Sequence, residues 1–268
     1  MSKVVALAEL AARIPAGARI SCGGFQLNRP PLALVRELIR QGTRGLDLIL
    51  LPNPLPLDWL VATQQVRFAE VTFSGFQYEF GSVVPPNWKR ACETRTVEYR
   101  ERDALYLVQG LRAAAMGLPL MPVPYGALEE DGPDVRTIRD PFTGREIVVV
   151  EPLEPDFSLV HAQVADEDGN LWIEDAVTDL LVAQASRRVL ATAERIESRL
   201  TRMNVPGFRV EAVAEARAGA WPGACAGFYR HDAKAIRAYV RASQNGQFSE
   251  FLEQYDEAIE QRASEVVS

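Results

Sequence analysis

Residues 19–51, RISCGGFQLNRPPLALVRELIRQGTRGLDLILL, contain the unit that decides the fold. Short strands are predicted over residues 19–22 and over residues 46–51, and the second is almost entirely apolar. Between them, residues 31–41 have the pattern of a helix, with proline in the first turn and Gly42 directly after the last. Because apolar strands joined by a helix are typical of parallel sheets covered on both faces, this unit predicts an α/β fold.

The same alternation of strands and helices continues along the chain. Further strands are predicted over residues 66–74, 96–100, 146–150, 157–164, 188–192 and 210–215. Further helices are predicted over residues 5–14, 88–93, 104–116, 178–186, 232–242 and 246–261. Residues 118–145 are expected to be the longest irregular stretch. We therefore predict one α/β domain over residues 1–268, with an open, parallel-rich sheet flanked by helices and a helical segment from about residue 230 to residue 268.

Composition excludes several classes of function. The chain has 29 lysines and arginines against 36 aspartates and glutamates, and its net charge of −7 argues against binding to DNA or RNA. No apolar run approaches the roughly 20 residues of a membrane helix. Cys22, Cys92 and Cys225 are widely separated, and there are only two histidines, so neither a disulfide framework nor a metal site is predicted. We expect a cytoplasmic protein without a membrane anchor.

The first candidate site is the turn Gly23-Gly24-Phe25, which follows the first predicted strand. Glycines let a ligand approach the backbone closely, and the next helix presents N–H groups and a positive dipole end to an anion. The third glycine of a dinucleotide-binding motif is absent. The alternative, which the spacing alone favours, is a plain turn between a strand and a helix.

The second candidate site is the sequence SGFQYE, which begins at Ser74, at the end of the strand predicted from residue 66. Ligands of open parallel sheets bind outside the carboxyl ends of the strands, so we expect Ser74, Gly75 and Gln77 to contact the substrate. Glu79 is expected to support them without contact, because its charge repels an acidic substrate. Burial of Phe73 is expected as well. The alternative is an exposed polar loop without function.

Other reactive side chains are interpreted as structural. Cys22 is expected to be a small core residue and His161 a hydrogen-bonded core histidine. Residues 166–168 are expected to form a solvated acidic turn, and the carboxylates within residues 174–179 to cap a helix. The small-residue loop GACAGFY, residues 223–229, is expected to make a close backbone contact with a ligand or a partner.

The order and spacing of several short motifs carry more information than each motif alone. Besides the Gly-Gly-Phe turn, these are LRAAAMGLPLMP at 111–122, PD at 155–156, HAQVAD at 161–166, GN at 169–170, ATAERI at 191–196 and PGACAGFYRHD at 222–232. Over residues 3–255 the chain resembles the A (alpha) subunit of family I CoA-transferases, of the glutaconate CoA-transferase type. LPNPLP at 51–56, DPFTG at 140–144 and the acidic stretch at 174–183 are similar to the glutaconyl-CoA decarboxylase offshoot of that family.

This resemblance implies a CoA-transferase (NagB/RpiA-like) fold and an A-type subunit that acts on a dicarboxylyl-CoA thioester, of the glutaconyl-CoA or 3-methylglutaconyl-CoA type. It implies no permanently bound cofactor, because coenzyme A arrives with the substrate. The family's nucleophilic glutamate lies in a Ser-Glu-Asn-Gly segment, normally on the B subunit, and this chain has no such segment. A B-type partner in an A2B2 heterotetramer is therefore expected. The alternatives are biotin-independent decarboxylation of the same thioester and a non-catalytic CoA-ester-binding module.

Arg29 is the main departure from the family pattern. It stands where the family often has glycine, just before the helix of residues 31–41. A cation there is expected either to bind a substrate carboxylate or a CoA phosphate, or to be a plain surface charge. The expected substrate contacts are thus Gly23, Gly24, Phe25 and Arg29 together with those of the second site.

Overall fold

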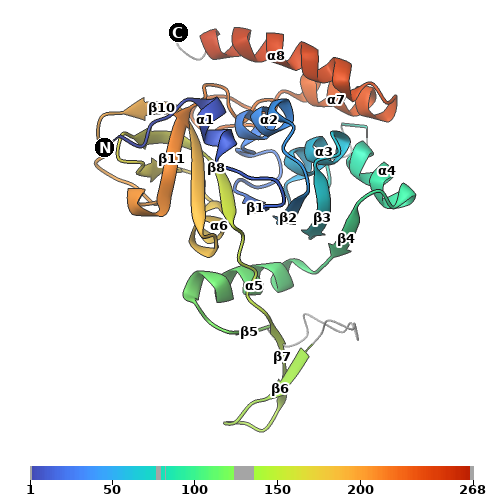
Figure 1. Cartoon of the computed structure of the whole chain (residues 1–268), viewed down its shortest axis with the longest axis vertical. Helices are drawn as coiled ribbons and strands as arrows, with labels where there is room; N and C mark the ends of the chain where they lie inside the picture. Colours follow the sequence, from blue (N-terminus) through green and yellow to red (C-terminus); the bar gives the residue numbers. More distant parts are fainter. Residues whose placement is uncertain (1, 77–79, 82, 124–135, 266–268) are drawn as a thin grey trace.

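Eight strands form the main sheet, which runs through the middle of the molecule (Figure 1). The computed structural model describes residues 2–76, 80–81, 83–123 and 136–265. From edge to edge the strands are β11 (Val210–Glu215), β10 (Arg188–Glu197), β8 (Phe157–Asp166), β1 (Arg19–Cys22), β2 (Leu46–Leu50), β3 (Val66–Val71) and β4 (Glu98–Glu101). These neighbours all pair in parallel, while β9 (Leu171–Trp172) pairs antiparallel with β8. The predicted parallel-rich α/β sheet is confirmed.

The strand order reverses at β1. The chain adds β2, β3 and β4 on one side of β1, and then β8, β10 and β11 on the other side. In open α/β sheets, ligands bind at such a switch point, outside the carboxyl ends of the strands. The fold therefore directs attention to the loops that follow β1, β2 and β3 and to the segment around the end of β8.

Helices cover both faces of the sheet because side chains alternate along each strand. In β2, Leu48 and Leu50 belong to one core and Ile49 belongs to the other. The first core includes residues of α1 (Leu7–Ala12), α2 (Leu32–Gln41), α3 (Pro54–Ala62), α4 (Pro86–Thr94), α7 (Ala233–Gln244) and α8 (Phe248–Glu265). The second includes residues of α5 (Ala104–Met116) and α6 (Asp179–Ala185). Figure 1 shows α7 and α8 outside α2 and α3, on the side of the sheet away from α5.

An aromatic cluster fastens the C-terminal helices to the first core. Trp59 of α3 is 0% exposed. Four aromatic rings of α7 and α8 surround it, with centroids 5.0 to 6.1 Å from the centroid of its own ring: Tyr239, Phe248, Phe251 and Tyr255. Rings of this size bury much apolar area, so this cluster is a major source of stability for the C-terminal segment.

The strand predicted over residues 66–74 is shorter than expected. It ends at Val71, and Phe73 is 54% exposed, so the expected burial of Phe73 is wrong. The neighbouring strand β2 ends at Leu50, and the last backbone hydrogen bond of this ladder runs from Thr72 N–H to Leu50 O. Over residues 73–76, the described residues that follow, no strand partner holds the chain in register.

The sequence interpretation also missed two features. Helix α3 was not predicted because Pro54 and Pro56 look like helix breakers, but both lie in the first turn, where an N–H group has no intrahelical partner.

The irregular stretch expected over residues 118–145 contains β5 (Met121–Pro122) and β6 (Arg136–Arg139), which pair antiparallel with β7 (Glu146–Val150) in a second sheet. A short 3-10 helix, η2 (Gly207–Arg209), leads into β11. Among the described residues, no helix is long and apolar enough to cross a membrane.

Candidate functional site

The loop after β1 is tied to β8 and to the start of α6. The Gly23 N–H donates to the carbonyl of Leu159 in β8 at 2.8 Å. The Gly24 N–H donates to Asp179 Oδ1 at 2.8 Å, and the Gly24 carbonyl accepts a hydrogen bond from the Thr178 hydroxyl at 2.5 Å. The first candidate site is therefore anchored at the switch point of the sheet by residues about 150 positions later in the chain.

Close contacts within the chain explain why both positions are glycine. Gly24 has a φ of +79°, and a Cβ there would lie 2.5 Å from the carbonyl oxygens of Asn28 and Arg29. A Cβ on Gly23 would lie 2.6 Å from Asp179 Oδ1. The atoms that approach these glycines are thus the protein's own, which is a different reason for glycine than the close ligand approach expected from the sequence.

Gly24→Ala is expected to be strongly destabilising. A left-handed conformation alone costs a non-glycine residue roughly 1–2 kcal/mol, and the backbone clash adds to that cost. Gly42→Ala is the matched control, because Gly42 also has a positive φ, +68°, but a Cβ there meets nothing within 4 Å. Urea unfolding should show a clearly larger loss for Gly24→Ala. Equal losses for the two variants would contradict the packing described here.

Arg29 belongs to the same loop and is 0% exposed, so the surface-charge alternative is wrong. Its guanidinium donates to both carboxylate oxygens of Asp179 at 2.8 and 3.0 Å, and to Asp175 Oδ1 at 2.5 Å. It also donates to the backbone carbonyls of His161 and Asp175. All five N–H groups thus face protein acceptors. Arg29 holds Asp179, and Asp179 in turn holds the Gly24 N–H.

Charge and burial act in opposite directions on this cluster. Burial lowers the pKa of Arg29, but the hydrogen bonds and charges of Asp179 and Asp175 outweigh it, and the pKa is raised. Burial raises the pKa of Asp175, but hydrogen bonds from Gln163 and Arg29, with the charge of Arg29, outweigh it and lower that pKa. Both groups are therefore held in their charged forms at neutral pH.

The carboxylates expected to cap a helix have other roles. The N-cap of α6 is Thr178, and it makes no side-chain capping bond. Asp179 binds Gly24 and Arg29 instead, and Asp175 binds Arg29. Glu174 is exposed. The capping prediction is wrong because a buried cation, distant in sequence, attracts two of these carboxylates more strongly than free helix N–H groups do.

Asn53, at the end of β2, links the loops after β1 and β3 and was missed by the sequence interpretation. It is 1% exposed, and its side-chain Nδ2 donates to the Gly23 carbonyl at 2.7 Å. Its backbone N–H donates to Ser74 Oγ at 3.3 Å, and that hydroxyl donates to the Thr72 carbonyl at 3.2 Å. The structure thus brings Gly23 and Ser74, from the two candidate sites, to one edge of the sheet through Asn53. The signal in the sequence that could have identified this residue is the position of Asn53 directly before a helix that begins with proline.

The rest of the second candidate site is partly described. Ser74 is 6% exposed, and a Cβ on the buried Gly75 would lie 2.8 Å from the Val83 carbonyl. Phe25 is half-buried. Gln77 and Glu79 lie outside the described residues.

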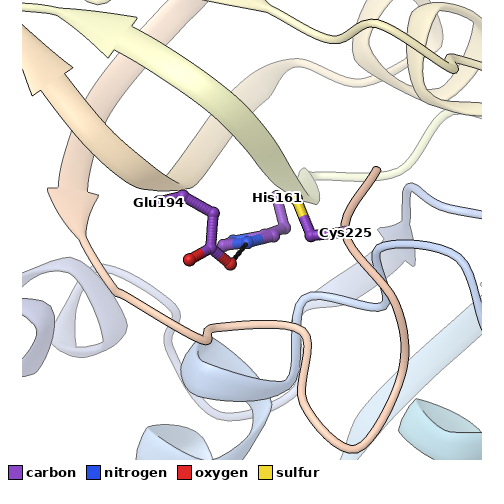
Figure 2. A group of neighbouring side chains, drawn as sticks. All are labelled: His161, Glu194 and Cys225. Atoms are coloured by element: carbon purple, nitrogen blue, oxygen red, sulfur yellow. Dashed lines mark hydrogen bonds and ion pairs between the residues drawn. The ribbon is translucent and has the colours of Figure 1, made fainter. Parts of the chain in front are cut away.

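A buried polar network lies next to the β1 loop, and Figure 2 shows two of its members, His161 and Glu194, with Cys225 beside them. His161 is 0% exposed, and its ring nitrogens bond to Thr192 Oγ1 at 2.9 Å and to Glu194 Oε1 at 2.8 Å. Glu194 also accepts a hydrogen bond from the Tyr229 hydroxyl and another, at 2.7 Å, from the Ala218 N–H. The expectation that His161 is a hydrogen-bonded core histidine is confirmed.

This network contains ligand types found in metal sites. One ligand atom from each of His161, Glu194 and Cys225 lies within 4.8 Å of the others, and all three residues are buried. However, both nitrogens of His161 and both carboxylate oxygens of Glu194 already have hydrogen-bond partners. Hydrogen bonding therefore accounts for this group without a metal ion.

The thiols near the site are buried and poorly suited to act as nucleophiles. Burial raises the pKa of Cys22 to about 12, and burial followed by the charge of Glu194 raises the pKa of Cys225. A thiol, unlike a thiolate, is a weak nucleophile. The interpretation of Cys22 as a core residue is confirmed by its 1% exposure.

Two further loop predictions need correction. Glu167 and Asp168 are exposed, as expected for a solvated turn. Asp166 is 0% exposed, because its carboxylate accepts hydrogen bonds from the N–H groups of Asp168, Asn170 and Leu200. The loop at residues 223–229 does make a close backbone contact, but within the chain. Ala224 exchanges hydrogen bonds of 2.7 Å with the loop after β1, receiving one from the Arg29 N–H and donating one to the Leu27 carbonyl.

A large cavity lies at the opposite edge of the sheet. It has a volume of about 450 Å³. Phe157 and Arg188, the first residues of β8 and β10, line it, which places it at the edge where these strands begin. Three arginines line it, but each is paired with a carboxylate, as Arg187 is with Glu154 at 2.9 Å. The polar groups and tight turns described above are at the carboxyl edge, so we place the candidate site there.

Comparison with known proteins agrees with this architecture. Residues 4–216 match the family described as Coenzyme A transferase. The A-type chain of glutaconate CoA-transferase from Acidaminococcus fermentans is 31% identical over 91% of this chain and 84% of its own length. An uncharacterised protein of Archaeoglobus fulgidus is 28% identical over 89% of this chain, but the chain spans only 56% of that protein.

Solved structures have the same fold. A crystal structure of a variant of the decarboxylase AibA/AibB superimposes with a TM-score of 0.89 and 44% identity, covering 95% of this chain and 99% of the other. The crystal structure of glutaconate coenzyme A-transferase from Acidaminococcus fermentans gives a TM-score of 0.85 and 25% identity, covering 94% and 88%.

Proposed function

The chain belongs to the coenzyme A transferase family, and from this premise we propose that it is the A-type subunit of a two-subunit enzyme that removes CO2 from a dicarboxylyl-CoA thioester. The substrate is of the glutaconyl-CoA or 3-methylglutaconyl-CoA type. The observation that carries the proposal is a carboxyl edge whose described cysteine, arginine and helix-terminal aspartate are buried, so that they shape the site without facing a substrate. Among the described residues there, Cys22, Arg29 and Asp179 are each at most 1% exposed, and Arg29 and Asp179 are paired with each other.

This arrangement supports a half-site that a partner completes. The chain has no Ser-Glu-Asn-Gly segment to supply the family's nucleophile. Two apolar side chains at this edge are exposed. Phe73, directly after Thr72, is 54% exposed, and Val177, directly before Thr178, is 60% exposed. Exposed apolar side chains beside a site are typical of protein interfaces. The proposed partner is a B-type subunit, and the proposed assembly is an A2B2 heterotetramer.

The role proposed for this chain is to shape the pocket and orient the thioester. Gly23, Gly24 and Phe25 are proposed as one wall, and Ser74 and Gly75 as the other. Gln77 lies outside the described residues and is proposed as a further substrate contact. Arg29 acts as a positioning residue, because its N–H groups hold Asp179 and Asp175. No permanently bound cofactor is proposed; coenzyme A is part of the substrate.

Decarboxylation is favoured over transfer by the 44% identity to the decarboxylase AibA/AibB. In this reaction the bond to the terminal carboxylate breaks and CO2 leaves. The electron pair moves into the conjugated thioester to give a dienolate, and a proton then restores a neutral enoyl thioester. Donors held around the thioester carbonyl stabilise the charge that develops there.

CoA transfer is the second candidate, favoured by the 31% identity to the A-type chain of glutaconate CoA-transferase. Mass spectrometry of glutaconyl-CoA incubated with the two-subunit complex, with and without acetate, separates the reactions. Decarboxylation gives CO2 and a four-carbon enoyl-CoA whether or not acetate is present. Transfer gives acetyl-CoA and free glutaconate only with acetate. Intact thioester under both conditions would contradict both reactions and favour a binding module.

Ser74→Ala tests the second wall of the site. If the hydroxyl turns from the Thr72 carbonyl to donate to the substrate, its loss should cost roughly 1–3 kcal/mol of transition-state binding. This corresponds to a fall in kcat/KM of about 5- to 150-fold. The matched control is Ser186→Ala, because the Ser186 hydroxyl is also buried but donates to Val182 O at the end of α6. Wild-type kcat/KM for Ser74→Ala in the complex would remove Ser74 from the active site.

A further inference from the structure

Four cationic side chains form one exposed stripe at the C-terminal end of the chain. Lys234, Arg237 and Arg241 are spaced three and four residues apart on α7, and Arg230 lies three residues before Ala233, the first residue of that helix. This spacing places the three helical residues on one face. All four are exposed. We call these four residues the α7 cationic stripe.

Among the described residues, the stripe has no counter-charge. In the part of the chain that the structure describes, none of its four charged groups forms an ion pair or a side-chain hydrogen bond, whereas many other arginines do, as Arg36 does with Asp256. The nearest carboxylate along the chain, Asp232, accepts from the Lys234 and Ala235 N–H groups and pairs with Arg262. In a chain with a net charge of −7, such a concentration of unpaired positive charge favours an anionic ligand.

Aromatic contacts connect the stripe to the candidate site. The ring of His231, next to Arg230, lies 5.8 Å from the ring of Phe80, and Phe80 lies 6.4 Å from Phe76. Phe76 directly follows Gly75, and its ring also lies 6.0 Å from Tyr239, which is on the buried face of α7, opposite to the stripe. The stripe therefore begins beside the loop after β3, and from Lys234 to Arg241 it extends about 10 Å along the helix.

We propose that the α7 cationic stripe binds the phosphate groups of the coenzyme A part of the substrate. This rests on the proposed function, which supplies a thioester whose acyl end occupies the carboxyl edge. Coenzyme A ends in a diphosphate and a ribose phosphate, and a pantetheine arm separates them from the thioester. Lysine and arginine bind phosphates through charge-assisted hydrogen bonds, and the dipole of α7 adds positive potential at its first turn, where Lys234 lies.

The test compares two ligands that differ only in the phosphate-bearing end. Calorimetry measures the Kd of coenzyme A and of pantetheine for the two-subunit complex, with the wild-type chain and with Lys234→Ala/Arg237→Ala. The double variant should weaken coenzyme A binding by at least about tenfold and leave pantetheine binding unchanged. Arg44→Ala is the matched control, because Arg44 is also exposed but lies before β2, at the opposite edge of the sheet.

Each other result overturns the proposal in a recognisable way. Unchanged coenzyme A affinity in the double variant removes the stripe as a phosphate site and leaves the proposed function standing. Equal weakening of both ligands indicates a general structural effect. A changed mass of the complex in light scattering assigns the stripe to a contact between the two chains. If the wild-type complex binds neither ligand, the proposed function falls as well.

Discussion

Replacing Arg29 by methionine should destabilise the protein by about 3–5 kcal/mol, because it leaves the carboxylate of Asp179 buried without its cation. Both side chains of that pair are 0% exposed. The loss should reach the site directly, since Asp179 also holds the Gly24 N–H at 2.8 Å. Arg187→Met is the control, because Arg187 forms an exposed pair with Glu154 and should cost at most about 1 kcal/mol. Urea unfolding at pH 7 measures both values.

Adding Asp179→Asn to Arg29→Met should recover part of the lost stability. A neutral amide needs no cation, and its oxygen still accepts from the Gly24 N–H. If the double variant is no more stable than Arg29→Met alone, the buried pair is not the cause of the loss.

The effect of Arg29→Met should also depend on pH. In the wild type the pKa of Asp175 is lowered by hydrogen bonds and by the charge of Arg29, so the stability it contributes is present at neutral pH and is lost as pH falls below about 4. Without Arg29 the pKa of Asp175 rises, so its carboxylate is protonated at a higher pH. Protonation removes the unpaired negative charge that destabilises the variant. The stability difference between the two proteins should therefore narrow as pH falls through this range. A constant difference would contradict the charge argument.

Trp59→Ala should destabilise the protein by roughly 3–5 kcal/mol, because it leaves a large cavity beneath α7 and α8. Trp59→Phe should cost clearly less, since it keeps an aromatic ring and removes an indole N–H that has no hydrogen-bond partner among the described residues. Trypsin should cleave within α8 faster in Trp59→Ala than in the wild type. Equal stability of the two variants would show that the aromatic cluster does not hold the C-terminal helices.

Local patterns were enough to predict most elements of the sheet. The strand, helix and strand of residues 19–51 and the helix between Asp103 and Gly117 follow from apolar periodicity and end signals that act over a few residues. Helix α3 was missed because a proline at the first turn and a proline that ends a helix look alike in one sequence. Phe73 was misplaced because the length of β3 depends on where its neighbour β2 ends.

The candidate site was harder to predict than the fold. The Gly-Gly turn was identified, but its partners Thr178 and Asp179 are about 150 residues away, and only the topology brings them together. For the same reason Arg29 was expected at a pocket edge or on the surface, although it is buried between two carboxylates. Pairing of this kind depends on three-dimensional contacts that spacing along the chain does not contain.

Turnover of glutaconyl-CoA by the chain alone, by its B-type partner alone and by their mixture tests the central claim most directly. Loss of the thioester is followed by mass spectrometry, and light scattering measures the mass of each sample. The half-site described here predicts turnover only in the mixture, where the two chains form one complex. Turnover at the rate of the mixture by this chain alone, as a monomer, would contradict it.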